Sequence, residues 1–150
     1  MNETAKQDVI LLADDDSDDR LLVRDAIADC GWDGDLRCVE NGEELLDYLL
    51  RRGKYASPAS APWPGVILLD LNMPRKDGRE ALREIKADAN LRRIPVVVLT
   101  TSKAEMDVAG LYDLGANSFI SKPVQFEGLV TAMRAVQQYW FQMVQLPAPK

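Results

Sequence analysis

Side chains that bind cations and phosphate oxygens follow several short aliphatic runs of this sequence. These residues are Asp14, Asp15, Asp16, Asp70, Asn72, Thr100 and Lys122. Carboxylate and carbonyl oxygens suit a hard divalent cation such as Mg2+, which takes few protein ligands and leaves positions for water and phosphate oxygens. A lysine ammonium and a threonine hydroxyl can hold those phosphate oxygens. Each residue is ordinary alone, but their coincidence predicts a site for a cation and a phosphate group.

The elements that must position these residues alternate between aliphatic runs and longer segments of helical period. Such alternation is typical of a parallel sheet with crossover helices, an α/β fold. The aliphatic runs predict strands at 9–13, 36–40, 66–70, 96–100 and 117–121. The helical patterns predict one helix after Ser17 that ends at Gly31, others at 43–52, 79–89 and 104–114, and one from 126 onward. The proline-rich segment 53–65 predicts a long loop.

In open parallel sheets, ligands bind beyond the carboxyl ends of the strands. Asp70, Thr100 and Lys122 each end or follow a predicted strand, as the acidic run does, so we expect them to converge at one edge. The simpler interpretation of the acidic run 14–19 is a solvated loop whose acids stabilise a helix N-terminus. Capping explains Asp70 poorly, because no helix is predicted until after Gly78.

The composition fits one globular domain and excludes several classes of function. The chain has 150 residues, of which 47% are hydrophobic and 28% charged, enough for a core of its own. It has no histidine, so it lacks the commonest zinc ligand and any phosphohistidine. A net charge of -6 with only scattered basic pairs argues against nucleic acid as a partner. The aliphatic runs are too short for a signal peptide or a membrane span, which predicts a soluble cytoplasmic protein.

Together the motifs resemble the response-regulator receiver domain of bacterial two-component signalling, of the chemotaxis-regulator type. The resemblance covers roughly residues 8–137 and rests on Asp14-Asp15, on Leu69-Asp70-Leu71-Asn72-Met73-Pro74 with Asp77-Gly78, on Val98-Leu99-Thr100-Thr101-Ser102, and on Lys122-Pro123. The spacing from Asp70 to Thr100 and on to Lys122 is typical of the family. The resemblance implies a flavodoxin-like, doubly wound fold with a five-stranded parallel sheet of order 2-1-3-4-5, to which the residues after 137 add an extended C-terminal helix.

The resemblance implies that Asp70 accepts a phosphoryl group from a phosphohistidine on a sensor histidine kinase. Asp15, Asp70 and the backbone carbonyl of Asn72 would hold Mg2+ or Mn2+. Asp14 would act mainly through a water, and Lys122 would pair with a phosphoryl oxygen. Such a chain is a signalling phosphoacceptor that catalyses its own phosphorylation and dephosphorylation, not an enzyme for other substrates. Because several like charges crowd together, the pKa of at least one carboxyl should be raised without metal.

Thr100 and Phe119 are the switch residues that the resemblance implies. The Thr100 hydroxyl would move to the phosphoryl group, and Phe119 would turn into the space behind it. Phe119 lacks the hydroxyl that many relatives carry at this position. By the same analogy the Lys122-Pro123 peptide would be cis. Thr101 and Ser102 border the site and would tune how water reaches the phosphoryl group.

The chain continues past the usual end of a receiver with an apolar segment. A heptad-like seam is formed by Leu129, Met133, Val136, Trp140 and Met143, with Phe141 alongside. Beyond 138 these side chains have no obvious core to join, and exposed apolar patches mark partner surfaces. We therefore expect a polar tail at 1–7, the receiver domain at 8–137, and a helical extension and tail at 138–150. We also expect a homodimer that forms through the last helix and this extension, with contacts from Leu129, Met133, Trp140, Phe141 and Met143. This ending and the long loop 53–65 look similar to stand-alone regulators of phytochrome-type kinases, so a bacteriophytochrome is the implied partner.

Two other functions stay open at this point. A phosphatase of the haloacid dehalogenase type also uses an aspartate at a strand end, but its general acid two residues later is here Asn72. A receiver-like docking module that is never phosphorylated should have lost one of the key residues, and Asp15, Asp70, Thr100 and Lys122 are all present. Phosphotransfer from a labelled kinase, with Asp70→Asn as control, separates these functions.

Overall fold

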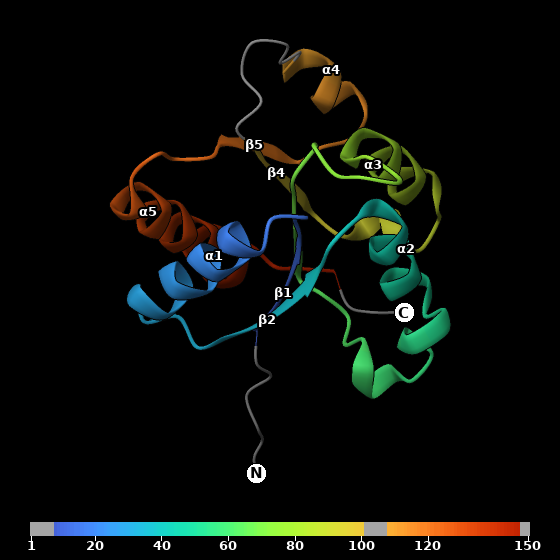
Figure 1. Ribbon diagram of the computed structural model, residues 1–150, viewed down its shortest axis with the longest axis horizontal. Coiled ribbons are helices and arrows are strands. Elements are labelled where there is room, and N and C mark those ends of the chain that lie inside the picture. Colours follow the sequence, from blue (N-terminus) through green and yellow to red (C-terminus); the bar gives the residue numbers. More distant parts are fainter. Residues whose placement is uncertain (1–7, 101–107, 148–150) are drawn as a thin grey trace.

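The computed structural model describes residues 8–100 and 108–147. A five-stranded parallel sheet of order β2-β1-β3-β4-β5 lies at its centre, which confirms the predicted topology (Figure 1). The strands are β1 (Asp8–Ala13), β2 (Gly34–Val39), β3 (Val66–Leu69), β4 (Val96–Thr100) and β5 (Ser118–Ser121). Every residue of β3 and β4 is buried, because a central parallel strand is covered on both faces.

Helices cover both faces of the sheet, as a doubly wound fold requires. They are α1 (Ser17–Asp29), α2 (Gly42–Leu50), α3 (Gly78–Ala87), α4 (Val108–Asp113) and α5 (Phe126–Val136). Helices α1 and α5 pack on one apolar cluster of the sheet, and α2, α3 and α4 pack on the other. Burial of each aliphatic side chain in these clusters contributes roughly 1.5–3 kcal/mol. None of the described helices is both long and apolar enough to cross a membrane.

Short helical segments complete the described chain. They are the 3-10 turns η1 (Gly53–Tyr55), η2 (Pro58–Ser60) and η3 (Leu91–Arg93), and the π-helical segment η4 (Gln137–Met143), which continues α5. The predicted loop 53–65 thus contains two turns, and Tyr48 of α2 ties it down by donating its hydroxyl to the Pro62 carbonyl at 2.6 Å.

Two details of the backbone differ from the prediction. Helix α2 ends at Leu50 rather than at 52, because Arg51 takes the left-handed conformation with a φ of 57°. The backbone N–H groups of Arg51 and Arg52 then donate to the carbonyls of Tyr48 and Asp47, which closes the last turn. The Lys122-Pro123 peptide is trans, so the expectation of a cis bond is wrong; trans is the more stable form of such a bond by about 0.5–1 kcal/mol. The first residues of the predicted helix 104–114 lie outside the described chain.

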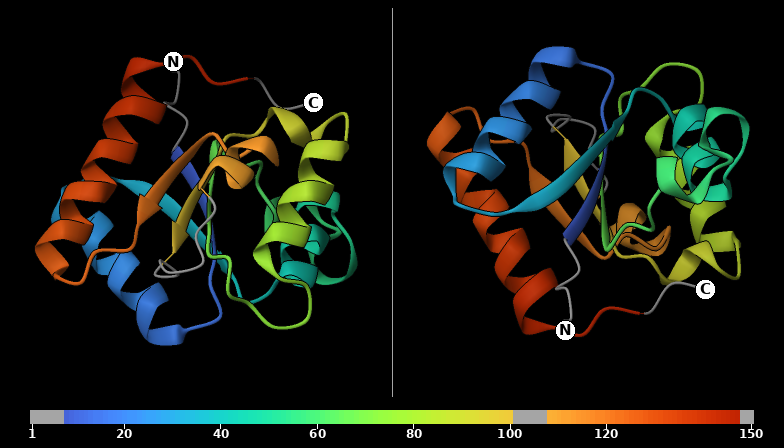
Figure 2. Two further views of the ribbon diagram at one scale, coloured as in Figure 1. Left: turned by 90° about the horizontal axis from the view of Figure 1, so that it is seen from above. Right: turned by 90° about the horizontal axis from the view of Figure 1, so that it is seen from below.

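The C-terminal segment folds back on the amino-terminal ends of the strands, where it crosses from α5 toward the opposite face (Figure 2). Phe141 packs on Trp32, with ring centroids 5.3 Å apart, and contacts Gly65 just before β3. The expectation that Phe141 has no core to join is therefore wrong, because residues distant in sequence supply that core.

Two residues expected at a dimer interface are buried inside the chain. Leu129 is 6% exposed and Met133 is fully buried in the cluster beneath α1 and α5. They are unavailable to a second copy, so the expectation that they form dimer contacts is wrong. The heptad-like spacing that suggested an interface is the spacing of a helix face packed on its own sheet.

Candidate functional site

Asp14 and Asp70 leave neighbouring strands side by side. Ala13 of β1 is paired with Leu69 of β3, and the N–H of Asp70 donates to the Ala13 carbonyl at 3.0 Å. Only 1% of Asp14 and 7% of Asp70 is exposed, whereas Asp15 is exposed. The strand pairing therefore brings two carboxyl groups together in a nearly buried position at the carboxyl edge of the sheet.

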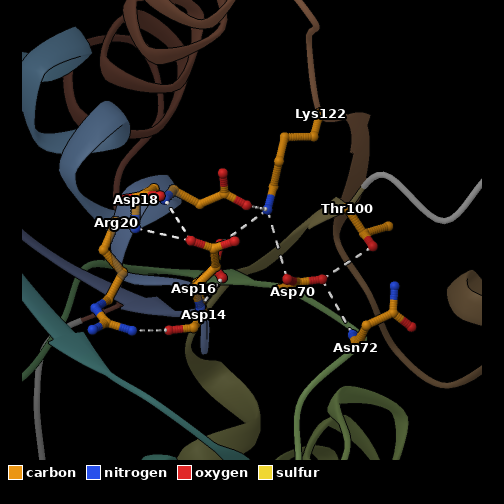
Figure 3. A network of polar contacts seen from close by, with 9 residues as sticks. Asp14, Asp16, Asp18, Arg20, Asp70, Asn72, Thr100 and Lys122 are labelled. Carbon is orange, nitrogen blue, oxygen red and sulfur yellow. Dashed lines mark hydrogen bonds and ion pairs between the residues drawn. The ribbon is translucent and has the colours of Figure 1, made fainter.

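Lys122 reaches over both carboxylates from the end of β5 (Figure 3). Its backbone N–H donates to the Thr100 carbonyl at 2.9 Å, which fixes the loop after β5 to β4. Its Nζ lies 2.9 Å from Asp14 Oδ2 and 3.6 Å from Asp70 Oδ2. Burial alone would lower the pKa of this ammonium, but the hydrogen bonds to Asp14 and Asp19 and the charge of Asp70 outweigh burial and raise that pKa. Lys122 therefore stays charged.

Two donors orient the carboxylate of Asp70. The Thr100 hydroxyl, which is fully buried, donates to Asp70 Oδ1 at 3.1 Å, and the backbone N–H of Asn72 donates to the same oxygen at 3.2 Å. The structure thus brings together the four residues that the sequence predicted to converge, namely Asp14, Asp70, Thr100 and Lys122. Thr101 and Ser102, expected to border the site, lie outside the described residues.

Asp14 shows the raised pKa that was expected for one of these carboxyl groups. Burial is the largest cause; the charge of Asp70 also raises the pKa of Asp14, while the Asp16 N–H and Lys122 lower it. The direction of the prediction is confirmed, but its reason changes: loss of solvent matters more than crowding of like charges.

The oxygen donors at this edge fit a divalent cation. One carboxylate oxygen from each of Asp14, Asp15 and Asp70 lies within 4.8 Å of the other two. Carboxylate oxygens are the ligands that Mg2+ and Mn2+ prefer. A cation here would also offset the excess of negative charge around the single ammonium of Lys122.

Three residues of the β1–α1 segment support the site; the helix-capping role of Asp16 agrees with the simpler interpretation of the acidic run, whereas the roles of Arg20 and Asp19 were not predicted. Asp16 caps α1 by accepting the N–H of Asp18 and of Asp19. Arg20 donates to the carbonyl of Asp14 at 2.7 Å, and Asp19 contacts Lys122. An arginine in the first turn of a helix opposes the helix dipole, and this local misfit was the one available signal.

Phe119 lies on β5 beside Val98 of β4. It is partly buried against the cluster that α2, α3 and α4 cover. One strand, β4, lies between β5 and the strand that leads to Asp70, and the role of Phe119 in switching stays a prediction.

Comparison with known proteins agrees with this geometry. Residues 10–134 match the family described as the response regulator receiver domain. The chain belongs to this family. Receiver domains are signalling phosphoacceptors, and this receiver is a response regulator of two-component signalling. Response regulator Rcp1 of Synechocystis sp. is 39% identical to it over 147 residues, which make up 98% of this chain and 98% of Rcp1.

Solved structures of phytochrome-associated regulators share the fold of this receiver. The phosphorylated cyanobacterial phytochrome response regulator RcpA has a TM-score of 0.86 and 39% identity, over 95% of this chain and 100% of RcpA. RPA3017, a response regulator in red light signaling of R. palustris, has a TM-score of 0.88 and 35% identity, over 94% of this chain and 99% of RPA3017. The Mn2+-bound form of Rcp1 has a TM-score of 0.82 and 40% identity, over 94% of this chain and 99% of Rcp1. The predicted family and the likeness to phytochrome-associated regulators are confirmed.

Proposed function

We propose that this receiver accepts a phosphoryl group on Asp70 from a phosphohistidine of a sensor histidine kinase. The observation that carries the proposal is the convergence on Asp70 of the Thr100 hydroxyl, the Asn72 N–H and the Lys122 ammonium. These groups come from different strand ends and fix the orientation of a nearly buried carboxylate. A phosphatase of the haloacid dehalogenase type would need an acid where Asn72 stands, and a docking module would not need this set of donors.

In the proposed reaction, a carboxylate oxygen of Asp70 forms a bond to phosphorus as the bond from phosphorus to the histidine nitrogen breaks. The electron pair of the broken bond returns to the imidazole. Because the transferring group spreads negative charge over its oxygens, the protein has to position and neutralise it. Lys122 would pair with one phosphoryl oxygen, and Thr100 would donate to another. The receiver would catalyse the later loss of the phosphoryl group to water with the same residues.

Asp15, Asp70 and the backbone carbonyl of Asn72 would hold Mg2+ or Mn2+ directly. The bound cation supplies positive charge that offsets repulsion between the carboxylates and the phosphoryl oxygens. Asp14 Oδ1 accepts the Asp16 N–H and Asp14 Oδ2 faces Lys122, which supports an indirect role for Asp14 through a water. The Mn2+-bound form of the relative Rcp1 supports the binding of a divalent cation by this receiver.

Thr100 and Phe119 would transmit the change of charge on Asp70. The Thr100 hydroxyl lies 3.1 Å from Asp70 Oδ1, so a small movement brings it to a phosphoryl oxygen. Phe119 would then turn inward and change the surface of α4, β5 and α5. In this proposal residues 8–137 form the receiver domain, and 138–150 an extension and tail.

The proposed partners are a bacteriophytochrome kinase and a second copy of this chain. The names of RcpA and RPA3017 support a kinase of the phytochrome type. For the homodimer, Met143 is 74% exposed and Tyr139 is 49% exposed, and Trp140 makes an edge contact with Tyr139 at 4.9 Å. The proposed interface therefore uses Met143 and the exposed part of Trp140. Trp140 and Phe141 are both partly buried against the apolar cluster that α1 and α5 cover.

Transfer of a radiolabelled phosphoryl group tests this function. With Mg2+, a bacteriophytochrome kinase labelled on its histidine should lose its label to the wild-type receiver. Transfer should stop with a chelator or with Asp70→Asn. Label on the Asp70→Asn chain equal to that on the wild type would overturn the assignment of Asp70.

A further inference from the structure

Asp19 contacts the lysine of the site, although it follows no strand. Its Oδ2 lies 3.0 Å from Lys122 Nζ. This distance is close to the 2.9 Å from Nζ to Asp14 Oδ2, and shorter than the 3.6 Å from Nζ to Asp70 Oδ2. The ammonium therefore lies nearer to the two acids of the β1–α1 segment than to the acid that would carry the phosphoryl group.

The start of α1 holds Asp19 in this position. The side chain of Asp16 accepts the N–H of Asp18 at 2.8 Å and that of Asp19 at 3.3 Å. This cap fixes the first turn of the helix, and α1 packs along α5. The backbone that carries Asp19 is therefore anchored at both its cap and its packed face.

The contact between Asp19 and Lys122 is also partly shielded from water. The Lys122 side chain is 9% exposed and that of Asp19 is 32% exposed. Ion pairs on an open surface contribute little because solvent screens them. A pair with one nearly buried partner is screened less, so the charge of Asp19 should matter to Lys122.

We propose that Asp19 is a positioning residue that competes with a phosphoryl group on Asp70 for Lys122. The inference rests on the proposed phosphorylation of Asp70. An ammonium has three N–H donors, and in this structure Asp14 and Asp19 take two of them. When Asp70 carries a phosphoryl group, the charge of Asp19 draws Lys122 away from the new oxygens and repels them. Asp19 therefore weakens the phosphorylated state.

Binding of beryllofluoride, a mimic of the phosphoryl group, tests this role in the full chain with saturating Mg2+. Asp19→Asn removes the charge but keeps the size of the side chain. We expect its apparent affinity for beryllofluoride to rise about fivefold, as expected for loss of a partly shielded charge contact. Asp19→Glu restores a carboxylate and should return the affinity to about the wild-type value, a rescue that a merely structural role would not produce.

Asp18→Asn is the matched control. Asp18 is the preceding residue in the same turn, is exposed, and makes no contact with Lys122 among the described residues. Its substitution makes the same change in net charge, and we expect an effect below about twofold because solvent screens it. If Asp19→Asn binds beryllofluoride no more tightly than Asp18→Asn, or if Asp19→Glu fails to restore the wild-type affinity, the competition does not exist. A wild-type chain that binds Mg2+ but no beryllofluoride overturns the proposed phosphorylation itself, which is a separate failure.

Discussion

The ammonium of Lys122 lies within 3.6 Å of the carboxylates of Asp14, Asp19 and Asp70. Asp14 is 1% exposed, and a buried charge is costly unless it is paired. Without a cation, Lys122 is the group that balances this acid. The same ammonium would later serve the phosphoryl group, so one residue links the stability of the site to its function.

Lys122→Met should therefore destabilise the metal-free chain. We expect the free energy of unfolding to fall by about 3 kcal/mol, because the substitution leaves a buried carboxylate without its partner. Mg2+ should recover more stability in this variant than in the wild type. Urea unfolding with a chelator and then with Mg2+ measures both effects. Lys54→Met, which removes a 72% exposed ammonium paired with Glu44, should change little; an equal loss in both variants would contradict this account.

The raised pKa of Asp14 predicts that binding of Mg2+ depends on pH. Burial favours the protonated acid in the folded chain. The stability that Asp14 contributes is thus complete below the ordinary aspartate pKa and is lost as pH rises through the raised value. Mg2+ requires ionised carboxylates, so protons compete with it.

Calorimetric titration of Mg2+ from neutral pH downward measures this competition. The affinity of the wild type should begin to fall before the range in which an ordinary aspartate titrates. Asp14→Asn should bind Mg2+ more weakly at neutral pH and lose that early fall. An affinity that stays constant down to the ordinary aspartate range would show that the pKa of Asp14 is not raised.

At the scale of elements, the N-terminus of α2 holds the backbone of the loop between β3 and α3 in place. The Gly42 N–H donates to the Lys76 carbonyl at 3.0 Å, and a Cβ on Gly42 would clash with that oxygen. Arg75 and Glu43 pair across the same contact at 3.1 Å. This loop also carries Asn72, so the N-terminus of α2 helps to set the backbone beside Asp70.

Gly42→Ala should displace that loop. We expect the free energy of unfolding to fall by about 1–3 kcal/mol from the steric conflict, and phosphorylation by a small phosphodonor to slow as well. Glu43→Ala, at the next position, breaks only an exposed ion pair and should change stability by less than about 1 kcal/mol. Urea unfolding and phosphorylation rates of the two variants test the role of this contact. Equal stability and equal phosphorylation rates in Gly42→Ala and Glu43→Ala would refute it.

The strands and the centre of the site could be predicted because four of the five aliphatic runs end in a site residue or stand just before one. Asp70 and Lys122 needed only the rule that parallel strands share one carboxyl edge. Asp19 could not be assigned, because its contact depends on the turn that Asp16 caps. Phe141 was misjudged for a related reason: its partners, Trp32 and Gly65, are far away in the sequence.

In the whole molecule, the site and the C-terminal extension lie at opposite ends of the strands. Asp70 follows the carboxyl end of β3, whereas Phe141 covers Gly65 before its amino end. A dimer formed through the extension would leave Asp70 open to the kinase. Phe141 and Met143 allow two roles of this segment to be tested separately: packing against the chain's own core and contact with a second copy of the chain.

Phe141→Ala should affect the stability of the fold, whereas Met143→Ala should affect formation of the dimer. Phe141→Ala should lower the free energy of unfolding by about 2 kcal/mol, because it removes a ring packed on Trp32. Met143→Ala should leave stability unchanged and weaken the dimer. Urea unfolding measures the first effect, and sedimentation velocity over a range of concentrations measures the second. A wild-type chain that sediments as a monomer at high concentration, with and without beryllofluoride, would contradict the dimer.

The central claim is that Asp70 carries the phosphoryl group, and mapping the modified residue tests it most directly. The chain would be treated with acetyl phosphate and Mg2+, reduced with borohydride to trap the acyl phosphate, digested, and sequenced by mass spectrometry. Our account predicts one trapped residue, Asp70, and no trapping without Mg2+ or in Asp70→Asn. Trapping at Asp14 or Asp15, or an unmodified Asp70 in a folded chain that binds Mg2+, would contradict it.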